Sequence, residues 1–389
     1  MRICIVTHRV VKGNGQGRVN YEIAAEALKR GADVYVVGSE AAEELLAHPR
    51  FTFIPVTYPR RLPVLLGYQL FALKSGLAVQ ALRRQEKVDI VLVNGFITWA
   101  RGDFNAVHFV HSAWFQSPVH SFRVDPTWKR WYFGLYTMVN SWLERVAFRQ
   151  SSAIIAVSSK VKEEMVELGI DRSKVHVITN GVDTNEFYPA PKGGREQWPL
   201  PPGRVVGLFA GDIRTPRKNL DTVLKAMVHA ERLHLLVAGD TQDSIYPQLA
   251  ATLGIEDRVT FLGYRSDVNH LMRQVDLFIF PSRYEACSLV VLEALASGLP
   301  VIITEQSGVT EIIERTEGSL SPGFVLDDPD DDQALGKLFH QLIDSPEELQ
   351  RRGEAARQVA LSHHWERMSV HYLALFEHHI RQKQQAAVH

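Results

Sequence analysis

Residues 276–304, DLFIFPSRYEACSLVVLEALASGLPVIIT, indicate the fold of the whole chain. The apolar run at its start is closed by Pro281, which predicts a buried strand that ends at a turn. Helix-forming residues fill Ser288–Ser297, and Gly298 stops this helix before a second strand at Val301–Ile303. Strand, loop, helix and strand form a βαβ unit of a parallel sheet. Ligands of such sheets bind beyond the carboxyl ends of the strands.

Two glutamates bracket the loop and the first turns of this helix. Glu285 precedes the helix, and Glu293 lies roughly two turns into it, about 8 Å along the axis. The loop ends at Ser288, and the amides of Leu289 and Val290 fall between the two carboxylates. A helix N-terminus suits a diphosphate, and carboxylates on either side can accept hydrogen bonds from sugar hydroxyls. The spacing alone leaves open a loop glutamate and a solvated helix glutamate without any ligand.

Length and composition predict a two-domain globular protein with no nucleic-acid partner. The chain has 389 residues, 46% hydrophobic residues and a net charge of -1, and one hydrophobic core rarely serves more than about 300 residues. The charge gives no general attraction to nucleic acid. With only Cys4 and Cys287, no disulfide framework is expected, which favours a reducing compartment. The amino terminus has no signal-peptide pattern, and no uninterrupted apolar run reaches about 18 residues.

The first turn of the chain is rich in glycine. A strand is expected at Ile3–Thr7, and the loop Lys12–Arg18, KGNGQGR, leads into a helix from about Val19 to Lys29. Gly15 and Gly17 can let backbone amides approach a phosphate, although their spacing is not the dinucleotide fingerprint. The alternative is a flexible turn between strand and helix.

Further strands alternate with helices through the amino-terminal half, which predicts a doubly wound sheet. They are expected at Asp89–Val93, Ala106–Val110 and Ala153–Val157. His111 follows the second of these strands directly, where a site residue belongs. His108 is expected to face the core or a neighbouring loop.

Two segments of this half mix basic and aromatic residues. Pro59–Lys87 combines arginines and lysines with Leu, Phe and Val, and Trp114–Arg149 carries four tryptophans among five cations. Such segments can seat a helix on an anionic bilayer or form an acceptor groove. The alternative is that the aromatic side chains pack inside and the cations are solvated.

In the carboxyl-terminal half, Gly211 opens a polar loop between a strand and a helix. Arg214, Arg217 and Lys218 gather in this loop, at the carboxyl end of a strand. Cations there would stabilise a leaving nucleoside diphosphate as its charge develops. The alternative is a solvated basic loop.

Two other stretches have plain structural interpretations. Glu186–Pro202 is rich in Pro and Gly and is the predicted linker, which divides the chain into domains at 1–185 and 186–364, with a last helix at 365–389. The acidic run Asp327–Asp332 is expected to cap a helix near Gln333, so no metal site is predicted.

The block PSRYEACSLVVLEALASGLPVI resembles the signature of the retaining, nucleotide-sugar-dependent glycosyltransferases of family four. The resemblance implies that Glu293 binds the ribose, that Glu285 faces the donor sugar, and that His111 contacts the same sugar. Ala286 to Ser288 stand where the family usually has Gly-Phe-Gly. The element containing Asn180, TNGVD, resembles the family's turn at the domain junction.

The same resemblance extends to the basic loop and to a base-binding loop. It implies that Lys218 binds the diphosphate, whereas Asp212 occupies the position of the family's usual arginine. Arg214 or Arg217 substitutes for that arginine, and the sequence leaves open which one. Tyr264 is implied as a contact for the nucleotide base. The glycine-rich first loop would border the diphosphate and the acceptor.

The resemblance implies the GT-B architecture, two doubly wound Rossmann-like domains facing across a cleft, with the acceptor on the amino domain and the donor on the carboxyl domain. The expected activity is retaining, metal-independent transfer of a sugar from a nucleotide-sugar such as a UDP- or GDP-sugar to a glycan, lipid-linked or small-molecule acceptor. No cofactor is expected, and the expected location is the cytoplasm or the inner face of the membrane. The alternatives are a noncatalytic nucleotide-sugar-binding protein and a nucleotide-sugar epimerase.

Overall fold

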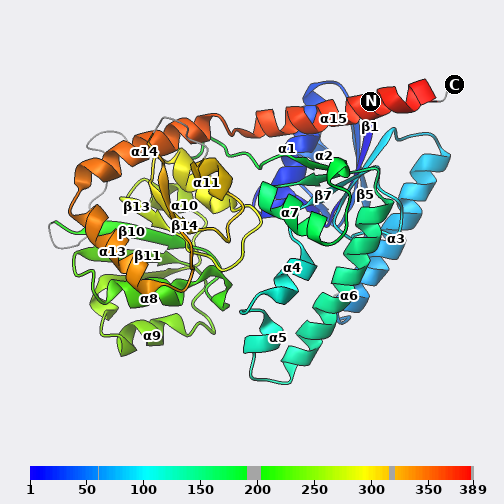
Figure 1. Cartoon of the computed structure of the whole chain (residues 1–389). Coiled ribbons are helices and arrows are strands. Elements are labelled where there is room, and N and C mark those ends of the chain that lie inside the picture. Colours follow the sequence, from blue (N-terminus) through cyan, green and yellow to red (C-terminus); the bar gives the residue numbers. More distant parts are fainter. Residues whose placement is uncertain (60, 191–202, 315–319, 387–389) are drawn as a thin grey trace. The chain divides into compact units, whose positions relative to one another are not determined.

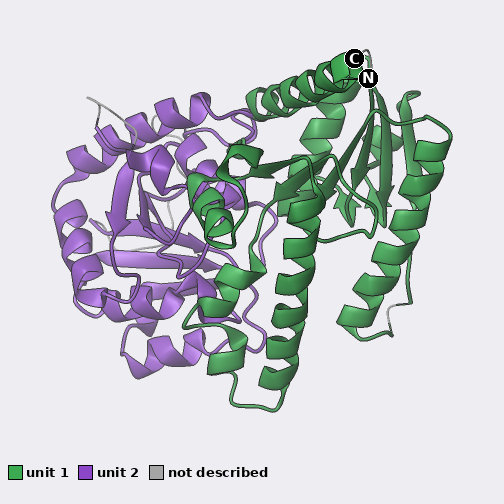
Figure 2. Ribbon diagram, turned by 45° about the vertical axis from the view of Figure 1, so that its right-hand side comes forward, with its two compact units in different colours: residues 1–181, 365–389 green, residues 182–364 purple. Residues whose placement is uncertain are grey.

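The computed structural model describes residues 1–59, 61–190, 203–314 and 320–386, and this part of the chain forms two compact units (Figures 1 and 2). Unit 1 comprises Met1–Gly181 and Trp365–His389, and unit 2 comprises Val182–His364. Residues 191–202 of the predicted linker lie outside the described residues. Each unit is an α/β domain built on a parallel sheet, so the predicted pair of Rossmann-like domains is confirmed.

Unit 1 contains a seven-stranded sheet in the order β5-β3-β1-β6-β7-β8-β9, and each pair of neighbours is parallel. Its strands are β1 (Arg2–Val6), β3 (Asp33–Gly38), β5 (Phe51–Pro55), β6 (Ile90–Asn94), β7 (Phe104–Val107), β8 (Ala153–Ala156) and β9 (Val175–Val177). A separate short ladder joins β2 (Arg9–Val10) to β4 (Glu40–Ala41). The strand predicted at Ala106–Val110 is wrong in position, because β7 ends three residues earlier.

The helices of unit 1 connect these strands, and the carboxyl-terminal helix α15 packs on the same unit (Figure 1). They are α1 (Gly15–Lys29), α2 (Glu43–Leu46), α3 (Val64–Arg84), α4 (His111–Gln116), α5 (Ser121–Val124), α6 (Lys129–Gln150), α7 (Ser159–Glu167), the 3-10 turn η1 (Arg172–Lys174) and α15 (Trp365–Ala386). The predicted start of the first helix near Val19 is wrong. The side chain of Asn14 accepts a hydrogen bond from the amide of Gly17 at 2.8 Å, and this cap starts the helix at Gly15.

A buried amide pair fixes α1 against the centre of the sheet. The side chains of Asn20 and Asn94 exchange two hydrogen bonds of 3.2 Å, and Asn94 also donates to the carbonyl of Val6 at 3.1 Å. Both side chains are buried, and a buried amide costs free energy unless it is paired. The pair therefore sets the position of α1 relative to β1 and β6.

Unit 2 contains a six-stranded parallel sheet in the order β12-β11-β10-β13-β14-β15. Its strands are β10 (Val205–Ala210), β11 (Leu233–Ala238), β12 (Val259–Gly263), β13 (Leu277–Ile279), β14 (Val301–Thr304) and β15 (Gly323–Leu326). Its helical segments are η2 (Pro216–Lys218), α8 (Leu220–Met227), α9 (Tyr246–Thr252), η3 (Glu256–Arg258), α10 (Val268–Met272), α11 (Leu289–Ala296), α12 (Thr310–Glu314), α13 (Asp332–Ile343) and α14 (Pro346–Leu361). The βαβ unit predicted from residues 276–304 is confirmed as β13, α11 and β14. The predicted capping is also confirmed, because Asp331 accepts from the amide of Ala334 at 2.8 Å.

The strand order reverses once in each sheet, and this reversal decides where a ligand can bind. In unit 1, β1, β3 and β5 follow one another toward one edge of the sheet, and β6 then pairs with the other side of β1. In unit 2 the corresponding neighbours are β10 and β13. Connections on the two sides of such a point leave in opposite directions, so a crevice forms at the carboxyl ends of the two strands.

Helix α3 carries apolar side chains both on the side that faces the core of unit 1 and on the side that faces solvent. Its inner side packs Phe71, Val79 and Leu82 into the core of unit 1. Within the described residues, only α3 is long and apolar enough to cross a bilayer by length and composition, with a mean hydropathy of 1.2 over its most apolar window. A helix packed in a core passes the same test, so this is weak evidence for a span.

Helix α15 is held on unit 1 by an apolar face. Phe376 is fully buried, and its ring centroid lies 4.8 Å from that of Phe104 on β7. Tyr372 is fully buried one turn earlier, and Lys383 reaches Asp103 at 2.6 Å near the end of the helix. The carboxyl-terminal helix therefore belongs to the core of the amino-terminal unit.

We predict that Phe376→Ala lowers the free energy of unfolding of unit 1 by about 3–5 kcal/mol, because it leaves a cavity against β7. Urea titration followed by circular dichroism measures this change. Gln384→Ala, at an exposed position of the same helix, serves as the control and should leave the midpoint unchanged. An unchanged midpoint for Phe376→Ala would show that α15 does not stabilise the unit.

Candidate active site

Two loops of unit 2 meet at the carboxyl ends of β10 and β13 and bring three predicted residues together. The ammonium group of Lys218 forms an ion pair with the carboxylate of Glu285. A guanidinium nitrogen of Arg217 lies 3.8 Å from the same carboxylate oxygen. The side chains of Lys218 and Glu285 are only 12% and 14% exposed. The predicted cationic loop and the first signature glutamate therefore form one buried cluster.

The surroundings of Lys218 disfavour its positive charge unless an anion is present. Burial lowers the pKa of its ammonium group, Glu285 acts in the opposite direction, and neighbouring Arg217 lowers the pKa further. The ammonium group also lies 4.8 Å from the centre of the Phe280 ring, a cation–π distance. Lys218 and Arg217 share the carboxylate of Glu285 at ion-pair distance, and the charge of Asp212 also acts on both cations. The two cations would attract an anionic ligand.

Arg214 points to different partners from those of Arg217. Its side chain donates to Asp212 at 3.0 Å and lies 3.7 Å from Asp240. Burial tends to raise the pKa of Asp212, but hydrogen bonds from Arg214 outweigh burial and lower this pKa overall. Of the two arginines that the sequence left open, Arg217 is therefore the one beside Lys218 and Glu285.

Arg283, which the sequence analysis did not single out, fastens the two loops to each other. Its guanidinium group donates to both carboxylate oxygens of Asp221, at 2.6 and 3.0 Å, and to Asp330 at 2.7 Å. It also donates to the carbonyl of Pro216 at 2.7 Å, and its own amide donates to the carbonyl of Arg217. Bidentate pairs of this kind fix geometry as well as adding energy. An arginine two residues before Glu285 carries no sequence signal that distinguishes it from a surface cation.

Backbone conformation adds two more constraints on the basic loop. Asn219 has a φ of 66°, in the left-handed region that Asn tolerates better than most residues, and its buried side chain donates to the carbonyls of Pro281 and Pro329 at 2.9 and 2.5 Å. Gly239, at the end of β11, leaves no room for a side chain, because a Cβ there would lie 2.5 Å from the carbonyl oxygen of Gly211. The loop from Gly211 to Asn219 is thus held in place from several directions.

The amino end of α11 lies directly after the Glu285 loop. Ser288 is its N-cap residue, and in the described part of the chain no side chain caps this end. The amides of Leu289 and Val290 open the helix, and the first amides of an α-helix have no partner inside it. Glu293 lies on the second turn and is half-buried. The loop itself is pinned through its backbone, since the amide of Glu285 donates to the carbonyl of Gln306 at 3.0 Å.

The residues that stand where the family usually has Gly-Phe-Gly are packed inward. Ala286, Cys287 and Ser288 are 4%, 8% and 4% exposed. Their side chains therefore occupy interior space. The departure from the family pattern changes the packing beneath the loop more than the surface that the loop presents.

In unit 1, His111 begins α4 instead of following a strand directly. Its ring nitrogen Nδ1 lies 2.9 Å from Glu144, and its amide donates to the same carboxylate at 3.0 Å. The amide of Ser112 donates to the other oxygen at 3.1 Å. The Glu144 side chain is 3% exposed, so a buried carboxylate orients the ring and leaves Nε2 for another partner. Sequence reasoning missed Glu144 because it lies 33 residues further along the chain, on α6.

A cavity of about 230 Å³ lies beside this pair, at the point where the strand order of unit 1 reverses. Residues after β1, β6 and β7 line it, together with Tyr68 of α3 and Tyr136 of α6, whose ring centroids are 6.5 Å apart. Burial lowers the pKa values of His8 and His108, which also line it, to about 4. At neutral pH these rings are uncharged. The lining thus combines aromatic rings and uncharged polar groups with the carboxylate of Glu144, which suits a polar ligand such as a sugar.

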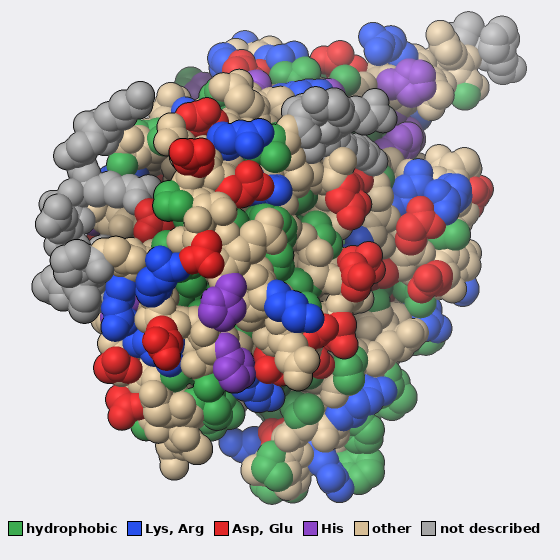
Figure 3. Space-filling model, turned by 60° about the vertical axis from the view of Figure 1, so that its left-hand side comes forward, with side chains coloured by type: hydrophobic (Ala, Val, Ile, Leu, Met, Phe, Trp, Pro, Cys, Tyr) green, Lys and Arg blue, Asp and Glu red, His purple; other side chains and the backbone are tan. Residues whose placement is uncertain are grey.

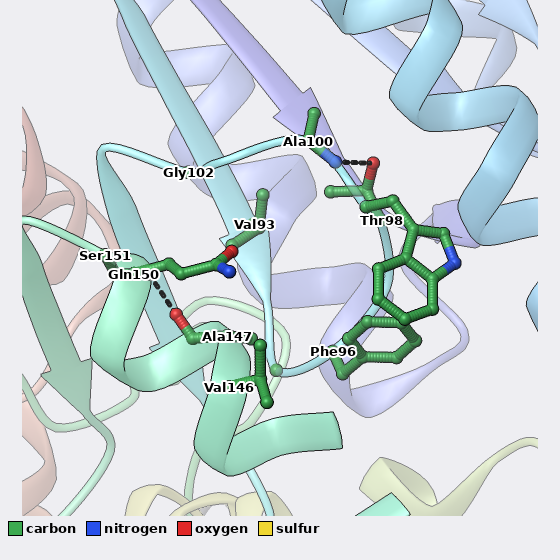
Figure 4. A pocket seen from close by; sticks show the side chains of 11 residues that line it. Val93, Phe96, Thr98, Ala100, Gly102, Val146, Ala147, Gln150 and Ser151 are labelled. Atoms are coloured by element: carbon green, nitrogen blue, oxygen red, sulfur yellow. Dashed lines mark hydrogen bonds between the residues drawn. The ribbon is translucent and has the colours of Figure 1, made fainter. Parts of the chain in front are cut away.

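A second hollow in unit 1 is too small for a substrate (Figure 4). Its volume is about 10 Å³, and Phe96 and Trp99 lie at one side of it, so it holds at most about one water molecule. The side chain of Thr98 accepts from the amide of Ala100 at 3.2 Å in its wall. No predicted site residue lines this hollow.

The remaining predicted residues are not gathered at the cluster in unit 2. Tyr264 follows the edge strand β12 and is 80% exposed. Gly15 and Gly17 lie in α1, where the amide of Gly17 is already used by the Asn14 cap. Asn180 is buried near the end of unit 1. Among the described residues, no group of three or more His, Cys, Asp or Glu residues could hold a metal ion.

Comparison with known families agrees with this architecture. Residues 13–186 match the family described as Glycosyltransferase Family 4, and residues 194–359 match Glycosyl transferases group 1. Two Rossmann-like domains, each built on a parallel sheet, together with these matches define the class of GT-B glycosyltransferases. The chain belongs to the glycosyl transferases of group 1.

Relatives of known name are similar over part of their length. Alpha-maltose-1-phosphate synthase of Mycobacterium tuberculosis is 27% identical over 262 residues, which cover 61% of this chain and 66% of the relative. An Escherichia coli enzyme named UDP-Gal:alpha-D-GlcNAc-diphosphoundecaprenol alpha-1,3-galactosyltransferase is 26% identical over 277 residues, covering 68% of this chain and 69% of the relative. The chain thus matches about two thirds of the length of these relatives.

Solved structures share the fold over almost the whole chain. Sucrose-phosphate synthase from Thermosynechococcus elongatus superposes with a TM-score of 0.78 at 19% identity, covering 99% of each chain. The Anabaena protein HepE, solved in complex with UDP-glucose, gives 0.68 at 20% identity, covering 99% of this chain and 100% of that one. WaaG, a glycosyltransferase involved in lipopolysaccharide biosynthesis, gives 0.73 at 18% identity and covers 96% of this chain and 99% of its own. At these identities the likeness concerns the fold.

The neutral His108 predicts a pH dependence of stability. Its pKa is lowered from 6.5 to about 4, so between these values the unfolded chain binds a proton that the folded chain does not. Stability present above about pH 6.5 is therefore lost as the pH falls. We predict that, between about pH 7 and pH 4.5, the free energy of unfolding falls by about 2 kcal/mol less in His108→Asn than in the wild type, because each pH unit between the two pKa values is worth ~1.4 kcal/mol.

Urea unfolding at a series of pH values measures this difference. His371→Asn, at an exposed position of α15, is the matched control and should follow the wild type. Identical pH profiles for His108→Asn and the wild type would contradict a neutral, buried His108.

Proposed function

We propose that this protein is a retaining glycosyltransferase that moves a sugar from a nucleotide-sugar to an acceptor hydroxyl. The observation that supports this most directly is the buried cluster of Lys218, Arg217 and Glu285 beside the open amino end of α11. It combines two cations with the first amides of a helix, an arrangement that suits a diphosphate. HepE, which shares the fold, was solved in complex with UDP-glucose.

In the proposed reaction, the bond between the anomeric carbon and the diphosphate breaks while the acceptor oxygen attacks from the same face. Lys218, Arg217 and the first amides of α11 stabilise the charge that develops on the diphosphate. The departing phosphate oxygen takes the proton of the acceptor hydroxyl. Glu293 binds the ribose hydroxyls, and Glu285 both balances Lys218 and accepts from the donor sugar. Positioning and electrostatics then supply most of the rate without a metal ion or cofactor.

Unit 1 supplies the acceptor site in this proposal. The 230 Å³ cavity beside His111 can receive a polar group of the acceptor, and Glu144 orients the ring of His111 so that Nε2 is available to the donor sugar. The acceptor is a glycan, a lipid-linked saccharide or a small molecule of bacterial glycan, lipopolysaccharide, glycolipid or secondary-metabolite synthesis. The proposed location is the cytoplasm or the inner face of the membrane, where nucleotide-sugars are available.

We predict that Glu293→Ala and Lys218→Ala each lower donor turnover about tenfold or more, the usual effect of losing one stabilising contact. Release of nucleoside diphosphate from a panel of UDP-, GDP- and ADP-sugars measures turnover. Wild-type rates in both variants would remove these residues from the site. Absence of release from every donor, together with binding of one, would favour the noncatalytic alternative.

The two arginines of the basic loop should differ in effect. We predict that Arg217→Ala loses at least about tenfold in turnover, because its guanidinium group belongs to the Lys218 cluster. Arg214→Ala should lose less, because that side chain is held by Asp212 and Asp240. The same diphosphate-release assay compares them, and the opposite order would assign the diphosphate contact to Arg214.

A further inference from the structure

One side of α6 presents large apolar side chains to solvent instead of to the core of unit 1. These residues recur at intervals of three and four, so they form one stripe along the helix. The α6 stripe consists of Trp128, Trp131, Leu135, Met138 and Trp142. Their exposed fractions range from 50% for Leu135 to 77% for Trp128. The interpretation that the aromatic side chains of this segment pack inside is therefore wrong for these three tryptophans.

Helix α3 carries a second stripe of the same kind. The α3 stripe consists of Leu66, Leu73 and Leu77, with exposed fractions from 53% to 61%. The two helices run side by side in unit 1 (Figures 1 and 2), and the rings of Tyr68 and Tyr136 approach each other between them. Two neighbouring helices thus expose apolar residues that a monomer in water would normally bury.

Cations outnumber carboxylates beside both stripes, where the nearby acids are Glu86 after α3 and Asp125 before α6. The exposed cations on or next to α3 and α6 are Arg61, Lys74, Arg84, Arg123, Lys129, Arg130, Arg145 and Arg149. Helix α3 has no acidic residue, and the one acid of α6, Glu144, is buried against His111. The whole chain has a net charge of -1, so positive charge is concentrated on this face. Arg145 and Arg149 continue the spacing of the α6 stripe beyond Trp142.

The surface view shows the same combination. Figure 3 is turned about the vertical axis from Figure 1, so the α5–α6 end of unit 1 stays at the bottom. Hydrophobic and basic side chains lie next to one another there.

We propose that the α3 and α6 stripes, with their flanking cations, form a docking surface for an anionic lipid bilayer. Tryptophan is favoured where hydrocarbon meets head groups, and arginine and lysine near that boundary are attracted to anionic lipid. A second copy of the chain fits less well, because its cations would face the same cations with too few carboxylates to pair with them. The inner side of α3 is part of the unit 1 core, so the helix lies on the bilayer and does not cross it.

The docking surface also narrows the class of acceptor, an inference that rests on the proposed function. Tyr68 and Tyr136, which line the 230 Å³ cavity, belong to the two helices that would lie on the bilayer. A head group carried by a membrane lipid would therefore arrive next to this cavity. Of the acceptor classes considered above, the lipid-linked saccharide fits this arrangement.

Flotation of the full-length chain with vesicles tests the docking surface. We expect binding to vesicles of phosphatidylglycerol and phosphatidylcholine, weaker binding to phosphatidylcholine alone, and release at high salt. Trp131→Ser with Trp142→Ser should weaken binding at least about tenfold, and Arg145→Gln with Arg149→Gln about fivefold or more for each cation removed. Tryptophan fluorescence should shift to the blue on binding, and this shift should be reduced in the tryptophan variant.

Matched controls are available in unit 2. Ile245→Ser removes an apolar side chain that is 69% exposed, and Arg351→Gln removes a cation that is 67% exposed; both should bind vesicles as the wild type does. Thermal melting checks that every variant is folded. Wild-type flotation of the tryptophan variant would overturn the proposal. So would a dimer in sedimentation that the same variant converts to monomer, because the surface would then join two copies.

The outcome is separable from that of the proposed function. Vesicle binding needs no donor, and release of nucleoside diphosphate needs no vesicle. A chain that floats with anionic vesicles but turns over no donor would keep the docking surface and lose the transferase. A chain that turns over donor but ignores vesicles would do the opposite.

Discussion

The candidate site of this protein depends on a buried lysine whose positive charge is disfavoured by its surroundings. Lys218 is buried, lies over the ring of Phe280 and next to Arg217, and forms an ion pair with the carboxylate of Glu285. Removing a partner from a buried charge costs several kcal/mol, so an ion pair of this kind persists until another anion can replace it. A nucleoside diphosphate is such an anion, and its arrival would free Glu285 to bind a sugar.

The fold makes this arrangement possible because the two loops come from strands on either side of the reversal in strand order. Lys218 follows β10 and Glu285 follows β13, and these two strands are hydrogen-bonded neighbours. Arg283 then ties the loops together through Asp221, Asp330 and the carbonyl of Pro216. The geometry of the cluster is set by buried, multiply bonded side chains, so it does not depend on flexible surface contacts.

Much of the fold could be predicted because its signals are local. The βαβ unit at residues 276–304 follows from the apolar runs and from Gly298 and Pro300, and the helix after Asp330 follows from its acidic cap. The start of α1 could not be predicted as easily, because Asn14 caps the helix over glycines that usually favour a loop. The strand before His111 was misplaced for a similar reason, since VHFV has the composition of a strand but β7 stops at Val107.

The residues that form the candidate cluster could be singled out from the sequence, but most of their partners could not. Lys218, Glu285 and Arg217 carry recognisable signals, whereas Glu144 and Arg283 act through contacts 33 and 62 residues away in sequence. The exposed tryptophans show the same limit. The composition of α6 indicated an apolar and basic helix, but only the packing of α6 shows which of its sides faces the core. Residue patterns identify candidates, and long-range contacts decide what they do.

Nucleotide binding to the wild type and to Lys218→Ala tests the central claim most directly. In a thermal-shift measurement, ligands that bind only the native state raise the melting temperature, so nucleoside diphosphates and the matching nucleosides can be compared side by side. A diphosphate should stabilise the wild type much more than its nucleoside does, and this difference should largely disappear in Lys218→Ala. Equal stabilisation by diphosphate and nucleoside in the wild type, or an unchanged difference in the variant, would contradict a diphosphate site at the Lys218–Glu285 pair.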